Sequence, residues 1–285
     1  MNKYHKLYVV ATPIGNLEEI SDLAKKILSK IKLIICEDTR VTQKLLNLLN
    51  LNFNQKLISF NKINETEKTQ KILQLLEKQE CVLVSDAGYP VISDPGFDLI
   101  KTLRKLNAPI QIVNGPCALI HALVASGIDS RKFFFANFLT KKKIQRKIEL
   151  NQLKPILNIS TIVYYEPLNY LITGLNILLD VFGDIVIGVG RELSKIHETF
   201  YYDKISNLIS QIELKGEFVI IIPKQDILDV CLSDQEIVIK VDQLLKSNIN
   251  LKSACKLLAT SKQSASLIYK TYIFKKKSKD KKLIS

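Results

Sequence analysis

The sequence predicts an α/β fold in which helices cover a mainly parallel sheet. Short apolar runs such as Leu33–Cys36 and Cys81–Val84 recur along the chain, and such runs are typical of strands buried on both faces. Segments with apolar residues at helical spacing separate these runs. Gly, Pro and Asp gather in the loops that follow several expected strands. This alternation of strand and helix is the pattern of a helix-covered parallel sheet.

Length and composition limit the class of protein further. A chain of 285 residues has room for about two domains, and 47% hydrophobic with 24% charged residues is ordinary for a soluble globular protein. No apolar run approaches the roughly 18 residues of a membrane span, and no apolar secretory segment opens the chain. The five cysteines lie far apart and there are only three histidines, so neither a metal site nor a disulfide framework is expected. We expect a reduced, cytoplasmic protein without membrane contact.

The first part of the chain, residues 1–115, is expected to form one α/β lobe. Ser21 is a predicted helix N-cap. Asn64 is another, with Glu67 three residues on as the acid that completes a capping box. The predicted strands are 7–11, 33–36, 56–59, 81–84 and 109–113, and the predicted helices are 21–28, 41–49, 64–76 and 95–103.

A second α/β lobe with a mixed sheet is expected over residues 116–223. Its predicted strands are 133–136, 161–165, 184–189, 197–202 and 217–222, and its predicted helices are 118–126, 142–153 and 168–181. Residues 224–285 show only helical patterns, at 234–246, 251–260 and 263–272. From Pro223 onward there are 13 lysines and 6 acidic residues, a local net charge of +7. This part predicts a small basic helical extension, either a helix-turn-helix-like module or a tail packed on the body.

The loop Ser85–Gly96 is the most distinctive stretch of the sequence. It follows a buried strand and contains two Asp, two Gly and two Pro within twelve residues. Open α/β sheets bind ligands at the carboxyl ends of their strands. Asp86 and Asp94 could accept hydrogen bonds from a ligand there, and glycine allows close approach of the backbone. The alternative interpretation is a turn whose Asp side chains cap the next helix.

Polar clusters follow other predicted strands as well. They lie at Thr12–Asn16, Glu37–Arg40, Asn114–Ala118, Glu166 and Arg191–Lys195. A capped loop explains each one alone, but together they can converge on one cleft at the ligand edge. The sequence holds no G-x-G-x-x-G, no phosphate-cradling G-x-x-x-x-G-K-[ST] and no G-x-S-x-G motif.

Several of these motifs closely resemble one known family. It is the bacterial ribosomal RNA small subunit methyltransferase I family, within the tetrapyrrole-methylase-like superfamily. The resemblance extends from about Leu7 to Pro223, and the order of the motifs makes it highly specific. The matching segments are Tyr8–Leu17, Cys36–Arg40, Val84–Gly88, Ser93–Gly96 and Gly190–Leu193 with Lys195.

The resemblance implies a two-lobed tetrapyrrole-methylase-like fold that binds S-adenosylmethionine between its lobes and works as a homodimer. It also implies the substrate, the 2′-hydroxyl of a cytidine in 16S rRNA of the 30S ribosomal subunit. The superfamily lacks the Rossmann glycine motif, which explains why none is found. The cofactor-binding residues expected on this basis are Pro13, Gly15, Asp86, Ala87, Gly88, Cys117, Ala118, Tyr165, Glu166, Gly190 and Arg191.

Methyl transfer to a ribose hydroxyl needs alignment and a group that supports the departing proton. Glu37 and Asp38 are the candidates for a base or hydroxyl-orienting group, and Arg40 is the candidate for positioning a phosphate. The alternative is an internal ion pair of Arg40 with Glu37 or Asp38 that stabilises the strand end.

The net charge of +13 suggests a polyanionic partner, although a genome-wide bias toward lysine would also produce it. The dense basic runs supply most of the expected RNA contacts, and Lys195, beside a motif that resembles the family, supplies one more. The expected contacts are Lys141, Lys142, Lys143, Arg146, Lys195, Lys275, Lys276 and Lys277.

The sequence departs from the family pattern at four places. Tyr89 replaces the usual Thr, and Asn114 replaces a Pro. Leu168–Tyr170 stands where a His-Arg pair is usual, and Ala136–Thr140 replaces Gly-Phe-Leu-Pro. Two other functions stay open: methylation of a small tetrapyrrole-like substrate, and RNA binding as a non-catalytic assembly factor.

Overall fold

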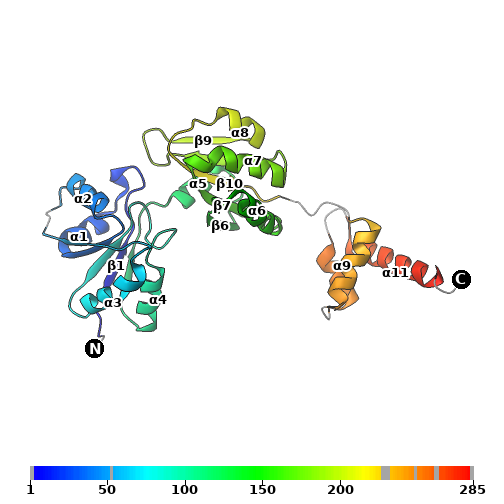
Figure 1. Cartoon of the computed structure of the whole chain (residues 1–285), viewed down its shortest axis with the longest axis horizontal. Helices are drawn as coiled ribbons and strands as arrows, with labels where there is room; N and C mark the ends of the chain where they lie inside the picture. The colour runs from blue at the N-terminus through cyan, green and yellow to red at the C-terminus, as the bar shows by residue number, and fades with distance from the viewer. Residues whose placement is uncertain (1–2, 52–53, 226–231, 247–248, 260–262, 283–285) are drawn as a thin grey trace. The chain divides into compact units, whose positions relative to one another are not determined.

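The chain divides into two compact units. The computed structural model describes residues 3–51, 54–225, 232–246, 249–259 and 263–282, with side chains up to residue 276. The first unit comprises Met1–Ile156 and Ser160–Pro223, and the second comprises Leu157–Ile159 and Lys224–Ser285. Two sheets build the first unit, whereas the described part of the second is helical (Figure 1).

The first sheet is entirely parallel, with strand order β3-β2-β4-β1-β5. Each strand is a short apolar run of the kind seen in the sequence. The predicted strands agree with the structure to within one residue. The strands are β1 (Leu7–Val10), β2 (Leu33–Cys36), β3 (Lys56–Ser59), β4 (Cys81–Val84) and β5 (Ile110–Val113).

Helices cover both faces of this sheet. Leu33 and Ile35 of β2 pack into a core with α3 and α4, while Ile34 and Cys36 pack into a second core with α1 and α2. Successive residues of a strand point to opposite faces. The residues on both faces of β2 are apolar, and this explains why the strand is a continuous apolar run in the sequence. The helices are α1 (Asp22–Lys30), α2 (Thr39–Leu48), α3 (Glu65–Leu76) and α4 (Phe97–Lys105), with the short 3-10 helix η1 (Leu17–Glu19) before α1.

One predicted helix cap is confirmed and the other is wrong. Ser21 accepts a hydrogen bond from the Ala24 N–H and so caps α1. Asn64 makes no side-chain cap of α3, because its Oδ1 accepts from the Asn61 N–H at 2.9 Å. Glu65 instead accepts from the Gly96 N–H at 2.9 Å. The acidic start of α3 therefore anchors the loop that follows β4.

The second sheet is mixed, as predicted, with strand order β6-β7-β10-β8-β9. β6 runs parallel to β7, and the other neighbouring pairs are antiparallel. The α/β fold with parallel and mixed sheets is thus confirmed. The strands are β6 (Phe133–Phe138), β7 (Thr161–Pro167), β8 (Val186–Arg191), β9 (Thr199–Lys204) and β10 (Glu217–Ile222).

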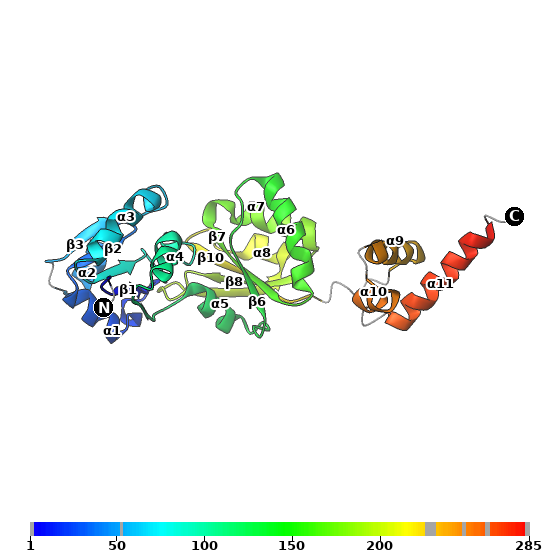
Figure 2. The same cartoon turned by 90° about the horizontal axis from the view of Figure 1, so that it is seen from below.

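A single helix, α5 (Ala118–Ser126), packs on one face of the second sheet through Leu119, Ala122 and Leu123. The other face is covered by α6 (Lys143–Leu157), α7 (Leu171–Phe182) and α8 (Ile205–Gln211), as Figure 2 shows. The 3-10 helix η2 (Leu168–Tyr170) precedes α7. α6 runs four residues past its predicted end and includes Pro155, and its last residue, Leu157, is fully buried.

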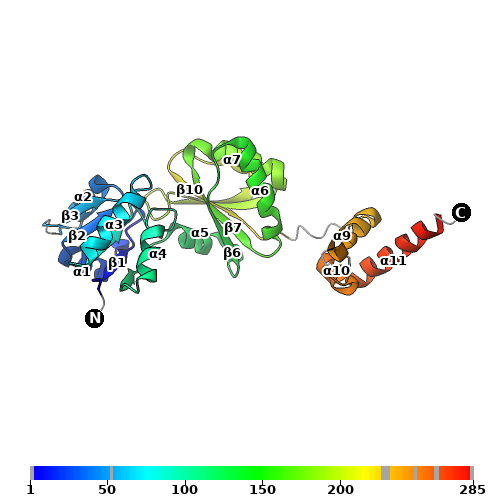
Figure 3. The same cartoon turned by 60° about the horizontal axis from the view of Figure 1, so that its bottom comes forward.

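The described part of the second unit forms a three-helix assembly (Figure 3). Its helices are α9 (Asp234–Lys246), α10 (Leu251–Leu258) and α11 (Ala265–Lys282). They enclose a small core that includes Ile237, Val241, Cys255 and Ile268. α11 continues ten residues past its predicted end, because the lysine-rich segment has good helix propensity and contains no Gly or Pro. No described helix is both long and apolar enough to cross a membrane.

Candidate functional site

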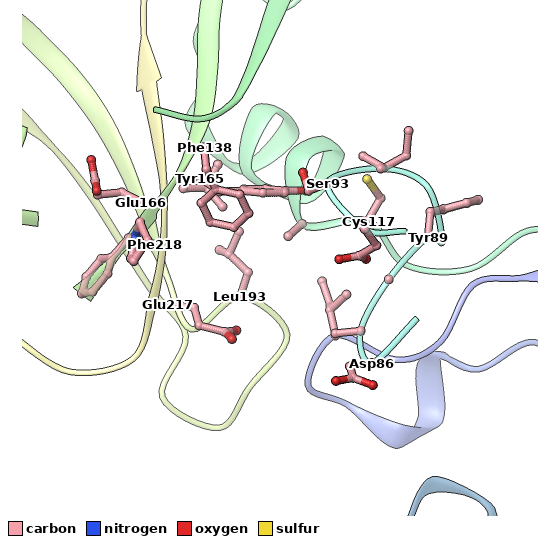
Figure 4. Close-up of a pocket in the computed structure, with 18 of the residues that line it drawn as sticks. Asp86, Tyr89, Ser93, Cys117, Phe138, Tyr165, Glu166, Leu193, Glu217 and Phe218 are labelled. Carbon is pink, nitrogen blue, oxygen red and sulfur yellow. The ribbon is translucent and has the colours of Figure 1, made fainter. Parts of the chain in front are cut away.

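The first unit holds a cavity of about 440 Å³ beside the carboxyl ends of the strands of the first sheet. Loops of the first sheet form one wall, and residues around the second sheet form the other (Figure 4). Figure 4 shows Asp86, Tyr89 and Cys117 on one side and Tyr165, Leu193 and Phe218 on the other. Seven predicted cofactor residues line it: Asp86, Ala87, Gly88, Cys117, Ala118, Tyr165 and Glu166.

The loop after β4 is held to the loop after β1. Thr12 and Gly88 exchange two backbone hydrogen bonds, of 2.9 and 3.1 Å. Gly88 has a φ of +73°, a conformation that glycine adopts without a Cβ penalty. The Ser85 hydroxyl donates to the Gly88 carbonyl at 3.1 Å. These contacts fix the backbone of Asp86 to Gly88 at the cavity wall.

Two departures from the family pattern contact each other. The Tyr89 hydroxyl donates to Asn114 Oδ1 at 3.3 Å and accepts from the Gly115 N–H at 3.2 Å. A Cβ on Gly115 would lie 3.0 Å from Ala11 Cβ, so glycine lets this loop approach β1 closely. Tyr89 and Asn114, the two residues that depart from the family pattern, therefore join the loops after β4 and β5.

Three carboxylates near the cavity, Asp94, Glu37 and Asp86, are partly buried and affect one another. Burial raises the pKa of Asp94 to about 7, and the charge of Glu37 adds to the rise. Burial also raises the pKa of Glu37, with a further contribution from Asp86. Burial raises the pKa of Asp86, whose Oδ1 accepts from the Asp38 N–H at 3.1 Å. Asp86 and Asp94 line the cavity, and the loop after β2 lies beside them.

Asp38 and Arg40 form an ion pair at the start of α2, the alternative that the sequence left open. Asp38 accepts from the Arg40 N–H at 2.8 Å as the helix cap, and the Arg40 guanidinium bonds the same carboxylate. Hydrogen bonds from Arg40 lower the pKa of Asp38 to about 2. A carboxylate with this pKa is a weak base. The Arg40 side chain is 89% exposed, so its outer surface remains open to solvent.

Arg146 does not lie on the basic surface that the sequence predicted. Its side chain is 2% exposed and makes a two-point ion pair with Glu166, at 2.9 and 3.2 Å. Its Nε donates to the Thr140 carbonyl at 2.8 Å. A buried guanidinium cannot contact RNA, so this prediction is wrong. Glu166 lines the cavity, but its carboxylate is engaged by Arg146.

Four of the predicted cofactor residues lie outside the cavity lining. Among the described residues that line the cavity, Pro13, Gly15, Gly190 and Arg191 do not appear. The buried Arg191 donates to the Lys215 carbonyl at 2.7 Å and pairs with Glu213 at 2.9 Å, which holds the segment that leads to Glu217.

The two glycines of this group leave room for neighbouring side chains. A Cβ on Gly15 would collide with Lys195, and one on Gly190 would press on Leu193. Lys195 itself pairs with Glu192 at 2.8 Å and with Glu217 at 3.0 Å.

The remaining predicted RNA contacts fall into two groups. Lys141, Lys142 and Lys143 are exposed at the start of α6. Lys275 pairs with Asp234 and Lys276 with Asp242, each at 2.9 Å, so these two lysines brace the second unit. The side chain of Lys277 lies outside the described residues.

Several lining residues were not in the predicted site. Phe138 comes from β6, Glu217 and Phe218 come from β10, and Leu193 comes from the loop between β8 and β9. Ser93 comes from the loop before α4. Apolar residues such as Leu193 and Phe218 read in the sequence as ordinary core positions. The sequence already indicated Asp94 as a possible acceptor for a ligand, and Ser93 could have been found beside it in the Ser85–Gly96 loop. In the part of the chain described, no three His, Cys, Asp or Glu side chains gather as metal ligands.

Comparison with known proteins assigns the chain to a class. The family model of the Tetrapyrrole (Corrin/Porphyrin) Methylases matches residues 6–209. The solved uroporphyrin-III C-methyl transferase from Thermus thermophilus, complexed with S-adenyl homocysteine, shares the fold at 15% sequence identity. Its TM-score is 0.53, over 76% of this chain and 96% of that chain. The match to the family model assigns the chain to the tetrapyrrole methylase class, and the solved structure shows that it shares the fold.

More similar relatives narrow this class. The chain is 40% identical over 257 residues to the Ribosomal RNA small subunit methyltransferase I of Mycoplasma pneumoniae, which covers 89% of this chain and 92% of that protein. It is 41% identical over 259 residues to the protein of the same name from Mycoplasma genitalium, with the same coverage. The chain belongs to the ribosomal RNA small subunit methyltransferase I family, as its motifs indicate.

Proposed function

We propose that this enzyme transfers a methyl group from S-adenosylmethionine to the 2′-hydroxyl of a cytidine in 16S rRNA. The observation that carries the proposal is the cavity of about 440 Å³, within the range of small-molecule sites. Its lining joins the Asp86–Gly88 loop to apolar side chains. The name of relatives that are 40% and 41% identical supplies the class of RNA.

The lining residues fit S-adenosylmethionine. The cofactor carries cationic sulfonium and ammonium groups on an adenosine, so it needs carboxylates at one end and apolar surface at the other. Asp86 and Asp94 supply carboxylates, and Leu193, Phe218 and Val219 supply apolar surface. At Gly88, the absence of a Cβ leaves the backbone open to close approach.

The bound cofactor supplies an activated methyl group. The protein has to align the hydroxyl and receive its proton. Asp94, with its pKa near 7, and Glu37, with its raised pKa, have more proton affinity than Asp38. We assign proton acceptance to one of these two carboxylates, and hydroxyl or phosphate positioning to the Asp38–Arg40 pair.

Methyl incorporation tests the proposed reaction. Labelled S-adenosylmethionine is incubated with isolated 30S subunits, with naked 16S rRNA and with a tetrapyrrole. We expect label in the RNA, recovered as 2′-O-methylcytidine after digestion. Label on the tetrapyrrole alone would identify the alternative enzyme. Cofactor binding without any transfer would support the assembly factor.

A variant of Asp86 tests the cofactor site. Asp86→Ala should weaken cofactor binding strongly in calorimetry, because a charged hydrogen-bond acceptor is removed from the cavity. Asp98→Ala is the control, since Asp98 is an exposed residue of α4. Equal affinities for the Asp86 variant and wild type would remove Asp86 from the cofactor site.

Glu37→Gln and Asp94→Asn separate the two candidate bases. The variant that removes the base should lose roughly 100-fold or more in single-turnover rate, the scale of general-base catalysis. Glu37→Gln should keep cofactor affinity near that of the wild type, because the effect belongs to the transition state. Asp94→Asn should also weaken cofactor binding, because Asp94 lines the cavity. Full activity in both variants would exclude both carboxylates.

The second unit is proposed to add RNA affinity. Truncation after Pro223 should weaken binding to 30S subunits and leave cofactor binding intact, because the cavity lies within the first unit. Unchanged affinity for 30S subunits would contradict this role.

We also propose that the protein is a cytoplasmic homodimer. Light scattering of the purified protein measures its mass and so tests the dimer.

A further inference from the structure

Two large apolar side chains lie exposed at the cavity, one from each lobe. Ile92 comes from the loop after β4 and is 44% exposed. Phe138 ends β6 and is 49% exposed. Both line the same cavity, where a ligand would cover them. Exposed apolar surface beside a polar site is typical of a ligand or partner contact.

The loop that carries Ile92 is strained. Val91 and Ser93, on either side of it, have φ values of +77° and +74°, which non-glycine residues rarely adopt. A Cβ on Gly96 would lie 3.0 Å from Val91 Cγ2, so this glycine makes room for the inward-packed Val91. The carboxylate of Glu65, at the start of α3, accepts a hydrogen bond from the Gly96 N–H. Strain of this kind is concentrated at ligand clamps and active sites.

Phe138 is also placed by an irregular backbone. The pairing of β6 with β7 shifts register between Phe135 and Phe138. Asn137, with a φ of +59°, accepts from the Phe138 N–H at 2.8 Å. The Phe138 ring packs against Tyr165 with centroids 5.4 Å apart, and Figure 4 shows the two side by side at the cavity. This packing orients the ring and leaves half of its surface open.

Positive charge follows directly after the exposed ring. Lys141, Lys142 and Lys143 begin three residues beyond Phe138 and are exposed. The Lys141 ammonium lies 5.9 Å from the centroid of the Tyr170 ring, which holds this lysine on the same lobe as Phe138. An apolar ring next to lysines matches a nucleotide, whose base is flat and whose phosphate is anionic.

We propose that Ile92 and Phe138 clamp the base of the target nucleotide while Lys141–Lys143 contact the neighbouring phosphates. This inference rests on the proposed function, since it takes the substrate to be RNA. Aromatic side chains stack on unpaired bases, and a stacked base also positions the ribose 2′-hydroxyl of the same nucleotide. The clamp makes Phe138 a positioning residue, because its ring holds the base and takes no part in proton transfer.

The test measures methylation of 30S subunits as a function of subunit concentration, with cofactor affinity measured in parallel. Phe138→Ala should lower kcat/KM roughly tenfold or more, the size of lost base stacking. Phe138→Tyr should keep most of the wild-type value, and Phe138→Leu should fall toward Ala, because leucine fills space but has no aromatic face. Phe134→Ala is the matched control, since Phe134 is 40% exposed on the same strand and is not among the cavity-lining residues described.

Ile92→Ala should give a smaller loss than Phe138→Ala, with Ile63→Ala as its exposed control. Cofactor affinity should stay within about twofold in all variants. Wild-type kcat/KM in Phe138→Ala, failure of Phe138→Tyr to retain activity, or equal losses of cofactor binding and transfer would overturn the clamp. A wild-type enzyme that methylates no small-subunit RNA would overturn the proposed function instead, and the clamp with it.

Discussion

Two arginine–carboxylate pairs of the first unit have the same chemistry and opposite surroundings. Asp38 and Arg40 are 28% and 89% exposed, whereas Arg146 and Glu166 are 2% and 1% exposed. Water competes with an exposed pair, and such pairs contribute about 0–1 kcal/mol. Burial of a charged pair costs desolvation free energy. Removal of one partner is strongly destabilising, because it leaves the other charge buried and unpaired. The first pair is therefore available to a substrate, and the second holds the lobe together.

Removal of Arg146 should give the largest effect. Arg146→Ala leaves Glu166 buried without its partner and should lower the free energy of unfolding by about 3–5 kcal/mol. Denaturant unfolding measures this loss. Lys147→Ala, which breaks an exposed pair with Asp180, is the control and should change stability by less than about 1 kcal/mol. Similar losses for both variants would abolish the contrast between buried and exposed pairs.

Gly174 tests how closely the buried pair is packed. A Cβ at this position of α7 would lie 2.7 Å from both Arg146 Nη1 and Glu166 Oε2. Gly174→Ala should therefore cost about 1–3 kcal/mol by overpacking, despite the better helix propensity of alanine. Thermal unfolding measures it, with the exposed Asn176→Ala on the same helix as the control. A stabilised Gly174→Ala would mean that the pair moves aside freely.

Asp94 lines the cavity as a half-buried carboxylate, and its effect on stability should depend on pH. Its pKa is about 7 in the folded protein, against an ordinary value of 3.8. The folded state therefore binds more protons than the unfolded state between these values, and stability falls as the pH rises from about 4 to 7. Asp94→Asn should remove this loss and stabilise the protein at pH 8 by about 1 kcal/mol, allowing for partial solvent contact.

Thermal unfolding at pH 5 and pH 8 checks the sign of this effect. The gain from Asp94→Asn should be larger at pH 8 than at pH 5. A gain that is the same at both values would show that the carboxylate does not titrate in this range.

Variants of Asp38 distinguish its role as a helix cap from its role in an ion pair. Asp38→Ala removes both and should cost about 1 kcal/mol, mostly through the lost cap of α2. Asp38→Asn keeps an acceptor for the Arg40 N–H and should cost less. Chemical denaturation of the two variants measures the difference. Equal costs would assign the stability to the charge instead of the cap.

Arg40 should have the smallest effect on stability. Arg40→Ala should change the free energy of unfolding by less than about 1 kcal/mol, because its side chain is 89% exposed. If Arg40 positions a phosphate, Arg40→Lys should still slow methyl transfer, since an ammonium cannot reproduce the planar fork. Single-turnover rates and unfolding curves on the same variants decide this. A clear loss of stability in Arg40→Ala would show that Arg40 has a structural role, as Arg146 does in its buried pair.

Much of the fold was predictable because its signals are local. The bounds of β2, β4 and β10 agree with the prediction, since each is an apolar run that ends at polar residues. The loop Ser85–Gly96 was also identified correctly as a cavity wall, because a polar loop after a buried strand has few other places to lie. The ends of α6 and α11 were missed, because tertiary packing and weak propensity decide where such helices stop.

The amino-acid sequence by itself determined the strands, the helices, the family and the loops that build the cavity, because periodicity and motif order are properties of neighbouring residues. Only the tertiary structure decided the roles of individual charged groups. Arg146 reads as part of a basic surface run, yet it is buried because Glu166, twenty residues on, and Gly174 supply a partner and a space for it. The pairing of Tyr89 with Asn114 and the exposure of Phe138 were likewise set by contacts between segments far apart in the chain. The physical reason is that burial and partner choice depend on three-dimensional packing, which the local pattern does not encode.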